Sequence, residues 1–290
     1  MIAFVGSVFS PYYHWSGRQH PENHVAFNVA FYGPEGAFWC MTERGCRSLE
    51  RGPSHVQIGA SSMAMQAGRL VITFDELALP WPGQRLLPGR VAGHVELTPE
   101  IVSDGFVDLD AAGRHVWSPR MPRASVTVNC SALPGGGWRG RAYHDMNYGD
   151  RPIEQDFIGW DWARGSAGAE GDTVILYDAI PRTGLPRRLA LRYSGSPTPE
   201  IMDLPARQDL PGGFWGVRSG VACDPSMAPA LVKRLEDSPF YTRACIETTL
   251  AGQRLEMVHE TLDCRRLAQP LVRLMLPFRM PRRQSWGRSP

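Results

Sequence analysis

Short stretches in which apolar and polar residues alternate recur along most of this 290-residue chain. Alternation with a period of two places one set of side chains on a single face, as in a half-buried β-strand. The segments that we interpret as strands are 70–74, 91–97, 125–128, 173–177, 189–193, 244–250 and 255–262. The residues Ala251-Gly252-Gln253, between the last two segments, are typical of a hairpin loop.

Helical periodicity is rare by comparison. One candidate helix is 226–237, which begins with a capping serine and has Leu231 and Leu235 on one face. The other is 267–276, with Pro270 in its first turn. Many strands and so few helices predict antiparallel sandwiches or barrels, so the expected fold class is all-β with few short helices.

Length and turn residues favour two domains over one. The 30 glycines and 25 prolines make up roughly a fifth of the chain, which fits many strands joined by tight turns. A loop-like stretch, Tyr148-Gly149-Asp150-Arg151-Pro152, lies near the midpoint. We therefore expect an N-terminal domain of residues 1–150 and a C-terminal domain of residues 151–290.

Charge and cysteine content exclude several function classes. Lys and Arg total 31 and Asp and Glu total 29, so a net charge of +2 gives no field that would attract nucleic acid. The six cysteines form no C-x-x-C motif, and we interpret them as mostly buried free thiols in a reducing compartment. Residues 1–10 lack the basic start of a secretory signal peptide, and no apolar run is long enough to span a membrane. The expected location is the cytoplasm.

The C-terminal segment differs from the rest of the chain. From Arg265 onward there are seven arginines and no acidic residue, so residues 1–264 carry 24 basic and 29 acidic groups, about −5 in all. Apolar residues are interleaved with the arginines between 271 and 280. This composition favours contact with an anionic membrane surface, and the alternative is an ordinary packed segment followed by a disordered end.

Two pairs of residues in the middle of the chain could carry chemistry. His115 and Trp117 would share one face of a strand, and Tyr143 and Asp145 would share a face of another. Apolar surroundings raise the pKa of a carboxyl group, and a protonated acid among aromatic rings can donate a proton to a poor base. The alternative is a structural aspartate that caps a turn beside core aromatics.

Other polar clusters have simpler interpretations. Pro21 breaks helical spacing between His20 and His24, and no third ligand motif follows, so we expect no metal site. Glu43 and Arg44 are expected to form a structural ion pair. Three further acidic residues are interpreted as solvated turn carboxylates: Asp150, Glu154 and Asp156.

Two more motifs are interpreted from the local sequence alone. Asp161 and its flanking tryptophans either belong to the core of the second domain or line a pocket. The cluster Gly135-Gly136-Gly137 lacks the lysine of a phosphate loop and is interpreted as a hairpin turn.

At these motifs the chain resembles the acyclic carotenoid 1,2-hydratases, also called hydroxyneurosporene synthases, of purple phototrophic bacteria. The most specific matches are Tyr143-His144-Asp145-Met146-Asn147-Tyr148-Gly149-Asp150-Arg151-Pro152 and Trp160-Asp161-Trp162. Further matches lie at residues 1–13, 23–30, 41–45 and 238–243. The resemblance covers most of the chain and implies two tandem lipocalin-like antiparallel β-barrel domains, the first of which carries the catalytic set.

The resemblance also implies an activity and a set of site residues. Asp145, His115, Trp117 and Tyr143 match the family's catalytic positions one by one. Trp160, Trp162, Tyr148 and Asn147 are expected to bind substrate. The implied reaction adds water across the terminal carbon 1–carbon 2 double bond of neurosporene, lycopene or a similar carotenoid, with no cofactor and no metal.

In the implied mechanism, Asp145 is the general acid, and Trp117 and Tyr143 face the developing cation. His115 would orient Asp145 or position the attacking water. Two other functions stay open at this point: a non-enzymatic lipocalin-like carrier of isoprenoids or lipids, and a polyene or terpenoid cyclase of the same superfamily. The expected partners are the carotenoid, water and the anionic surface of the inner, photosynthetic membrane.

Overall fold

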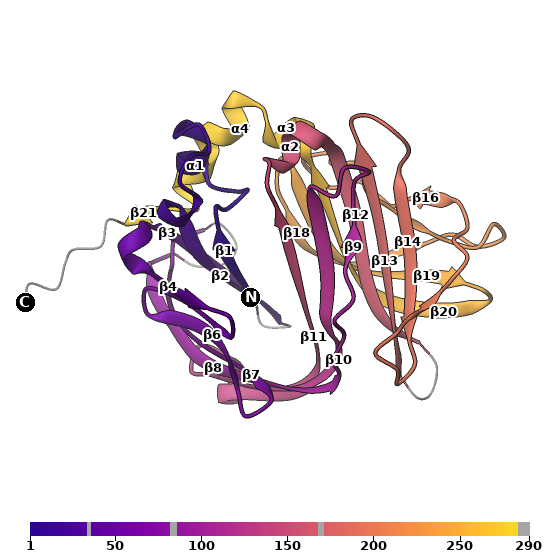
Figure 1. The fold of residues 1–290 in the computed structure, drawn as a ribbon, viewed down its shortest axis with the longest axis horizontal. Coiled ribbons are helices and arrows are strands. Elements are labelled where there is room, and N and C mark those ends of the chain that lie inside the picture. The colour runs from indigo at the N-terminus through magenta and orange to yellow at the C-terminus, as the bar shows by residue number, and fades with distance from the viewer. Residues whose placement is uncertain (34–35, 82–85, 168–170, 284–290) are drawn as a thin grey trace, which may run out of the picture. The chain divides into compact units, whose positions relative to one another are not determined.

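The computed structural model describes residues 1–33, 36–81, 86–167 and 171–283, and β-strands dominate it (Figure 1). The prediction of an all-β protein with few short helices is confirmed. The contacts divide the chain into two compact units. Unit 1 consists of residues 1–99, 124–142 and the stretch from 273, and unit 2 of residues 100–123 and 143–272. The domain limits 1–150 and 151–290 stay a prediction, because contact clustering does not test which segment folds independently.

A four-stranded sheet in unit 1 has the order β1-β2-β3-β21. Its strands are β1 (Ile2–Val5), β2 (Val25–Gly33), β3 (Gly36–Arg44) and β21 (Arg282–Arg283). β1, β2 and β3 pair in antiparallel fashion, whereas β21 runs parallel to β3 and places Arg282 opposite Glu43. The C-terminal segment is therefore part of this sheet.

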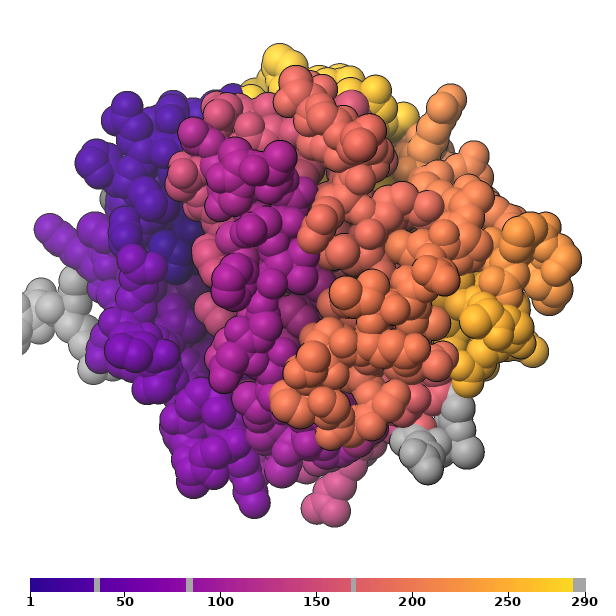
Figure 2. Space-filling model, turned by 45° about the vertical axis from the view of Figure 1, so that its right-hand side comes forward, coloured from indigo at the N-terminus to yellow at the C-terminus, as the bar shows by residue number. Residues whose placement is uncertain are grey.

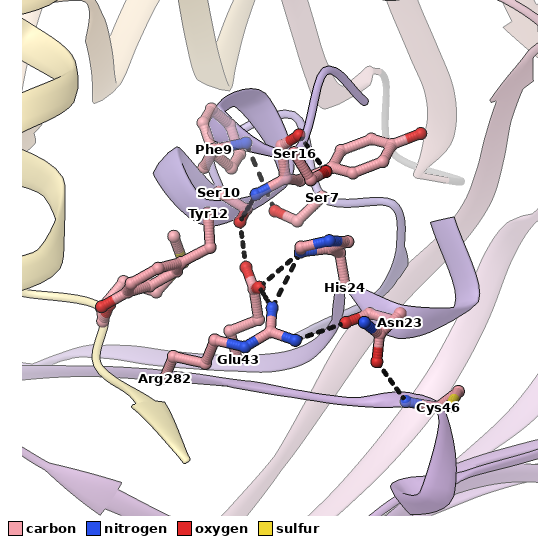
Figure 3. A network of polar contacts seen from close by, with 12 residues as sticks. Ser7, Phe9, Ser10, Tyr12, Ser16, Asn23, His24, Glu43, Cys46 and Arg282 are labelled. Atoms are coloured by element: carbon pink, nitrogen blue, oxygen red, sulfur yellow. Dashed lines mark hydrogen bonds and ion pairs between the residues drawn. The ribbon is translucent and has the colours of Figure 1, made fainter. Parts of the chain in front are cut away.

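A buried ion cluster fixes β21 to the N-terminal segments of unit 1 (Figure 3). The fully buried carboxylate of Glu43 accepts hydrogen bonds from Ser10 and Arg282, and its Oε1 lies 2.8 Å from Nδ1 of His24. The neighbouring Arg44 donates instead to Glu76, at 2.8 Å. The predicted ion pair between Glu43 and Arg44 is therefore wrong, because consecutive residues of a strand point to opposite faces.

A larger sheet has the order β11-β10-β8-β7-β6-β5-β4, with β9 paired to β10. Its strands are β4 (Leu49–Gly52), β5 (His55–Ile58), β6 (Ser61–Gln66), β7 (Arg69–Ala78), β8 (Gly89–Ile101), β9 (Val107–Asp108), β10 (His115–Cys130) and β11 (Gly137–Gly149). The division between the two units falls inside β8, β10 and β11. The short 3-10 helix Pro134–Gly136 joins β10 to β11, which confirms the predicted hairpin turn.

A seven-stranded sheet in unit 2 has the order β15-β14-β13-β12-β20-β19-β18. Its strands are β12 (Phe157–Ala167), β13 (Asp172–Pro181), β14 (Arg187–Tyr193), β15 (Glu200–Ile201), β18 (Ala230–Asp237), β19 (Tyr241–Leu250) and β20 (Gln253–Asp263). A two-stranded sheet of β16 (Arg207–Asp209) and β17 (Gly220–Ala222) also belongs to unit 2. On the face shown in Figure 2, the segment that leads into β9 lies beside β14.

β12 is buried on alternate residues, so its two faces have different surroundings. One face packs into an apolar cluster whose buried members include Ala163, Leu176, Val221, Ile246 and Leu255. The other face carries Trp160 and Trp162. The predicted hairpin between β19 and β20 is confirmed: Leu250 pairs with Gln253, and Ala251 and Gly252 have φ values of +50° and +74°.

The helices are short. They are α1 (Pro11–Trp15), α2 (Ile153–Asp156), α3 (Cys264–Leu267) and α4 (Pro270–Met275), with 3-10 turns at Pro21–Asn23, Cys46–Ser48 and Leu276–Phe278. The helix predicted over 267–276 is thus split before Pro270, which cannot donate a backbone hydrogen bond. No helix in the described ranges is long and apolar enough to cross a membrane.

The helix predicted over 226–237 is wrong, because residues 230–237 form the edge strand β18. β18 pairs with β19 and contains two register shifts, one between Leu231 and Lys233 and one between Arg234 and Glu236. Each bulge adds a residue and breaks the alternation of a regular strand. Leu231 and Leu235 are therefore four residues apart, a spacing that is also typical of one helical turn, and this explains the wrong prediction.

Candidate active site

The candidate site lies in unit 2, where the start of β10 and the end of β11 face the seven-stranded sheet (Figure 1). β10 supplies Trp117 and β11 supplies Tyr143 and Asp145. The ring centroid of Trp117 lies 5.3 Å from that of Tyr177 on β13, and the ring of Tyr143 lies 5.5 Å from that of Trp162 on β12. Non-local pairing of strands therefore joins segments that are separated in the sequence.

The carboxyl group of Asp145 is held by two donors. Its Oδ2 accepts a hydrogen bond from the indole Nε1 of Trp117 at 2.8 Å and another from the Tyr143 hydroxyl at 3.1 Å. Trp117 is fully buried, whereas Tyr143 and Asp145 are partly buried. Three of the four residues expected to be catalytic are thus brought together around one oxygen atom.

The surroundings favour the protonated form of this carboxyl group. Burial raises the pKa of Asp145 from 3.8 to about 6, although the hydrogen bonds from Trp117 and Tyr143 lower it, and the negative charge of Glu260 raises it further. Burial and the charge of Asp145 also raise the pKa of Tyr143 well above its usual range, so its phenol stays a donor. The carboxyl group can therefore hold a transferable proton up to about pH 6.

Aromatic rings line the region next to Asp145. Trp160 and Trp162 lie two residues apart on one face of β12, and Tyr177 is the direct cross-strand partner of Trp162. The rings of Trp160 and Tyr177 are 6.1 Å apart. Burial, followed by the charge of Asp145, raises the pKa of Tyr177 far above its usual range. Sequence reasoning placed residue 177 at the end of a strand, but the register that brings it to the site is not a local property.

His115 occupies a different position from the one expected. Its Nε2 lies 2.8 Å from Oδ2 of Asp156, and its ring packs edge-on against Phe157 at 5.0 Å. Asp156 was expected to be a solvated turn carboxylate, and this is wrong, because its side chain is mostly buried between His115 and Arg151. A Cβ atom at Gly149 would lie 2.7 Å from the His115 ring, so glycine is needed there.

The remaining predicted substrate-binding residues divide between the two faces of β11. Asn147 lies two residues beyond Asp145 on the same face of the strand, and Tyr148 lies on the opposite face; both residues are exposed. Glu154, a further predicted turn carboxylate, is buried, which is another correction to the sequence interpretation.

Asp161 lies on the face of β12 opposite to Trp160 and Trp162. Its carboxylate accepts hydrogen bonds from the Arg207 guanidinium at 2.9 Å and from the Thr261 hydroxyl at 2.6 Å. The backbone N–H of Gly220 donates to it at 3.3 Å. Of the two interpretations left open, Asp161 therefore takes the core position, and the tryptophans line the site.

Comparison with known proteins agrees with these features. The family model described as carotenoid hydratase CrtC matches residues 1–289. An acyclic carotenoid 1,2-hydratase of Thiocapsa roseopersicina is 42% identical over 286 residues, which cover 97% of this chain and 68% of that protein. The enzyme of the same name from Cereibacter sphaeroides is 38% identical over 289 residues and is matched over the full length of both chains.

The fold also resembles that of solved structures. One is the crystal structure of an AttH candidate from Nitrosomonas europaea, which matches with a TM-score of 0.56 and 12% identity. The match covers 82% of this chain and 80% of that one. At this identity the likeness concerns the fold alone, and it agrees with the all-β class.

Proposed function

The chain belongs to the carotenoid hydratase family, and from this premise we propose that it adds water across the terminal carbon 1–carbon 2 double bond of an acyclic carotenoid. Neurosporene and lycopene are substrates of this kind. The observation that carries the proposal is the carboxyl group of Asp145, held by Trp117 and Tyr143 among aromatic rings and with a pKa raised to about 6.

The first step is protonation of an alkene that has no activating group. The Asp145 proton adds to carbon 2, the π electrons form the new C–H bond, and the positive charge develops on the tertiary carbon 1. The rings of Trp117 and Tyr143, which flank the carboxyl group, can each stabilise a desolvated cation by about 1–2 kcal/mol.

The second step is capture of the cation by water. A lone pair of the water oxygen forms the C–O bond, and the excess proton passes to the Asp145 carboxylate, which restores the acid. Alkene and water give a tertiary 1-hydroxy carotenoid with no net oxidation or reduction. The proposed reaction therefore requires no redox cofactor.

The other predicted residues have supporting roles in this proposal. Trp160, Trp162 and Asn147 share the faces that meet at Asp145 and would bind the end of the substrate. His115 is a positioning residue, since its contact with Asp156 fixes the first residue of the strand that carries Trp117.

Replacement of the acid tests the proposal. Asp145→Asn retains the size of the side chain but removes the transferable proton, so hydration should fall by about 10²–10⁴-fold. The measurement is the yield of a product heavier by one water after incubation with lycopene. Co-sedimentation of lycopene with the variant should stay close to that of the unaltered protein.

The same incubation separates this function from its alternatives. Hydration at a normal rate by Asp145→Asn would contradict the assigned acid. Bound but unchanged lycopene with the unaltered protein would indicate a carrier, and an isomer of unchanged mass would indicate a cyclase.

The proposed substrate is insoluble in water and resides in membranes, so we also propose that the protein attaches to the cytoplasmic surface of the inner, photosynthetic membrane. Support comes from the C-terminal segment, where Leu274 and Phe278 are exposed. Residues 264–283 contain six arginines and no acidic residue. Exposed apolar side chains beside basic ones are typical of segments that bind anionic bilayers.

A further inference from the structure

The indole nitrogen of Trp162 is a buried hydrogen-bond donor for which the described residues provide no acceptor. Buried donors nearly always have a partner, and an unpaired one costs free energy. The ring of Trp162 packs against Tyr143, whose hydroxyl donates to Asp145. This unpaired N–H therefore belongs to a side chain that lines the reacting region.

The neighbouring donors are already used. Trp117 has one N–H and Tyr143 has one O–H, and both donate to Oδ2 of Asp145. Cross-strand pairing places Tyr177 on one side of Trp162 and Glu260 on the other. The N–H of Trp162 is thus a donor that the acid does not require.

The chemistry of the reaction restricts what this donor can bind. The reacting end of an acyclic carotenoid is a hydrocarbon and offers no hydrogen-bond acceptor. The oxygen atom of the reaction comes from water and ends in the tertiary hydroxyl group of the product.

We propose that the indole N–H of Trp162 binds the oxygen of the water that attacks carbon 1, and the hydroxyl oxygen of the product. This inference rests on the proposed hydration. A water oxygen has two lone pairs, so it can accept from Trp162 with one and form the C–O bond with the other. The released proton still passes to the Asp145 carboxylate, and Trp162 itself gains and loses no proton.

The test compares two reactions of the carbocation: capture by water, and loss of a proton to re-form the alkene. In D2O, Asp145 delivers a deuteron to carbon 2, and the cation then either captures water or loses a proton from carbon 2 and returns as labelled alkene. Trp162→Phe keeps an aromatic ring but removes the N–H. With lycopene as the probe, the ratio of labelled alkene to hydrated product should rise by about tenfold, as expected for loss of one hydrogen bond to the attacking oxygen.

Two matched variants complete the experiment. Trp138→Phe makes the same change at an exposed tryptophan at the start of β11, seven residues before Asp145, and should leave the ratio unchanged. Trp162→His restores an N–H in either tautomer and should recover part of the hydrated product. A thermal melt of each variant checks that it is folded, and the His variant carries the test if Trp162→Phe does not fold.

An unchanged ratio in folded Trp162→Phe would overturn the inference. Parallel loss of label and hydrated product would also overturn it, because Trp162 would then act in the protonation step. The proposed function fails separately, since its failure would be seen with the unaltered protein, as lycopene that yields no product heavier by one water.

Discussion

Asp145 combines two opposing effects on one carboxyl group. Burial disfavours the charged form, while the hydrogen bonds from Trp117 and Tyr143 favour it, and burial is the larger effect. The same two donors also fix the orientation of the carboxyl group. The acid is therefore held in place, and its pKa of about 6 keeps it protonated to a higher pH than an ordinary aspartate.

The first prediction concerns the pH dependence of hydration. Because the protonated form of Asp145 is the active one and its pKa is about 6, the rate should be constant at low pH and fall about tenfold per unit well above pH 6. The free energy of unfolding should also fall as pH rises. The pKa of Asp145 in the folded state lies above the ordinary 3.8, so the folded state binds more protons than the unfolded state and loses stability between about pH 4 and about pH 6. Initial rates from pH 5 to 9 provide the measurement.

Removing one of the two hydrogen-bond donors to Asp145 should shift the pH at which the rate begins to fall. Tyr143→Phe deletes a hydrogen bond that lowers the pKa of Asp145, so the inflection should move to higher pH. Tyr148→Phe alters an exposed ring on the opposite face of β11 and should not move it. An inflection that stays in place or moves to lower pH in Tyr143→Phe would contradict the account.

Residues that share a strand could be assigned from the sequence, whereas their partners on other strands could not. Tyr143 and Asp145 are two residues apart, so a period of two already places them on one face. Tyr177 and Asp156 meet the site through pairing between distant segments and through a short helix. The contact of His115 with Asp156, in place of Asp145, is of this second kind.

At the scale of elements, β12 connects the site to the core of unit 2. Trp160 and Trp162 pack against Tyr177 and Tyr143, and Asp161 between them points to the opposite side. There Asp161 joins β12 to β20 through Thr261 and to β16 through Arg207. These hydrogen bonds fix β12 on the face opposite to its two tryptophans.

The next prediction compares the contributions to stability of two carboxylates, one buried and one exposed, that bind the same arginine. Asp161→Ala removes a buried charged acceptor of Arg207 and should lower the free energy of unfolding by about 2–3 kcal/mol. Asp209→Ala removes a second carboxylate from the same guanidinium, but Asp209 is 82% exposed, and its loss should cost about 1 kcal/mol or less. Urea denaturation followed by tryptophan fluorescence measures both values. Equal losses would contradict a special role for the buried pair.

Regular strands were predicted well because their alternation is intact, as in 70–74 and 255–262, which lie within β7 and β20. β18 was missed because two bulges change its spacing. Its pairing with β19 supplies the backbone hydrogen bonds that a helix would otherwise make internally. Local periodicity does not contain this information.

At the scale of the whole molecule, the C-terminal segment has apolar side chains on both sides. Val272 and Met280 are buried, whereas Leu274 and Phe278 are 58% and 79% exposed. Arg273 contacts His14 of α1, so α1 lies beside the start of this segment within unit 1. The proposed membrane attachment would use this exposed apolar side, and the excess of arginines would favour an anionic bilayer.

The last prediction concerns membrane binding through this segment. Phe278→Asp places a charge where an apolar side chain would enter the bilayer, so it should lose about 1.5–3 kcal/mol of binding, at least a tenfold loss of affinity. Flotation with phosphatidylglycerol vesicles measures the affinity, and phosphatidylcholine vesicles or high salt should weaken binding by the unaltered protein. Leu185→Asp, at a residue of unit 2 that is 90% exposed, is the matched control and should bind normally. Equal binding by both variants, or a concentration-dependent dimer that Phe278→Asp abolishes, would show that a bilayer does not cover this surface.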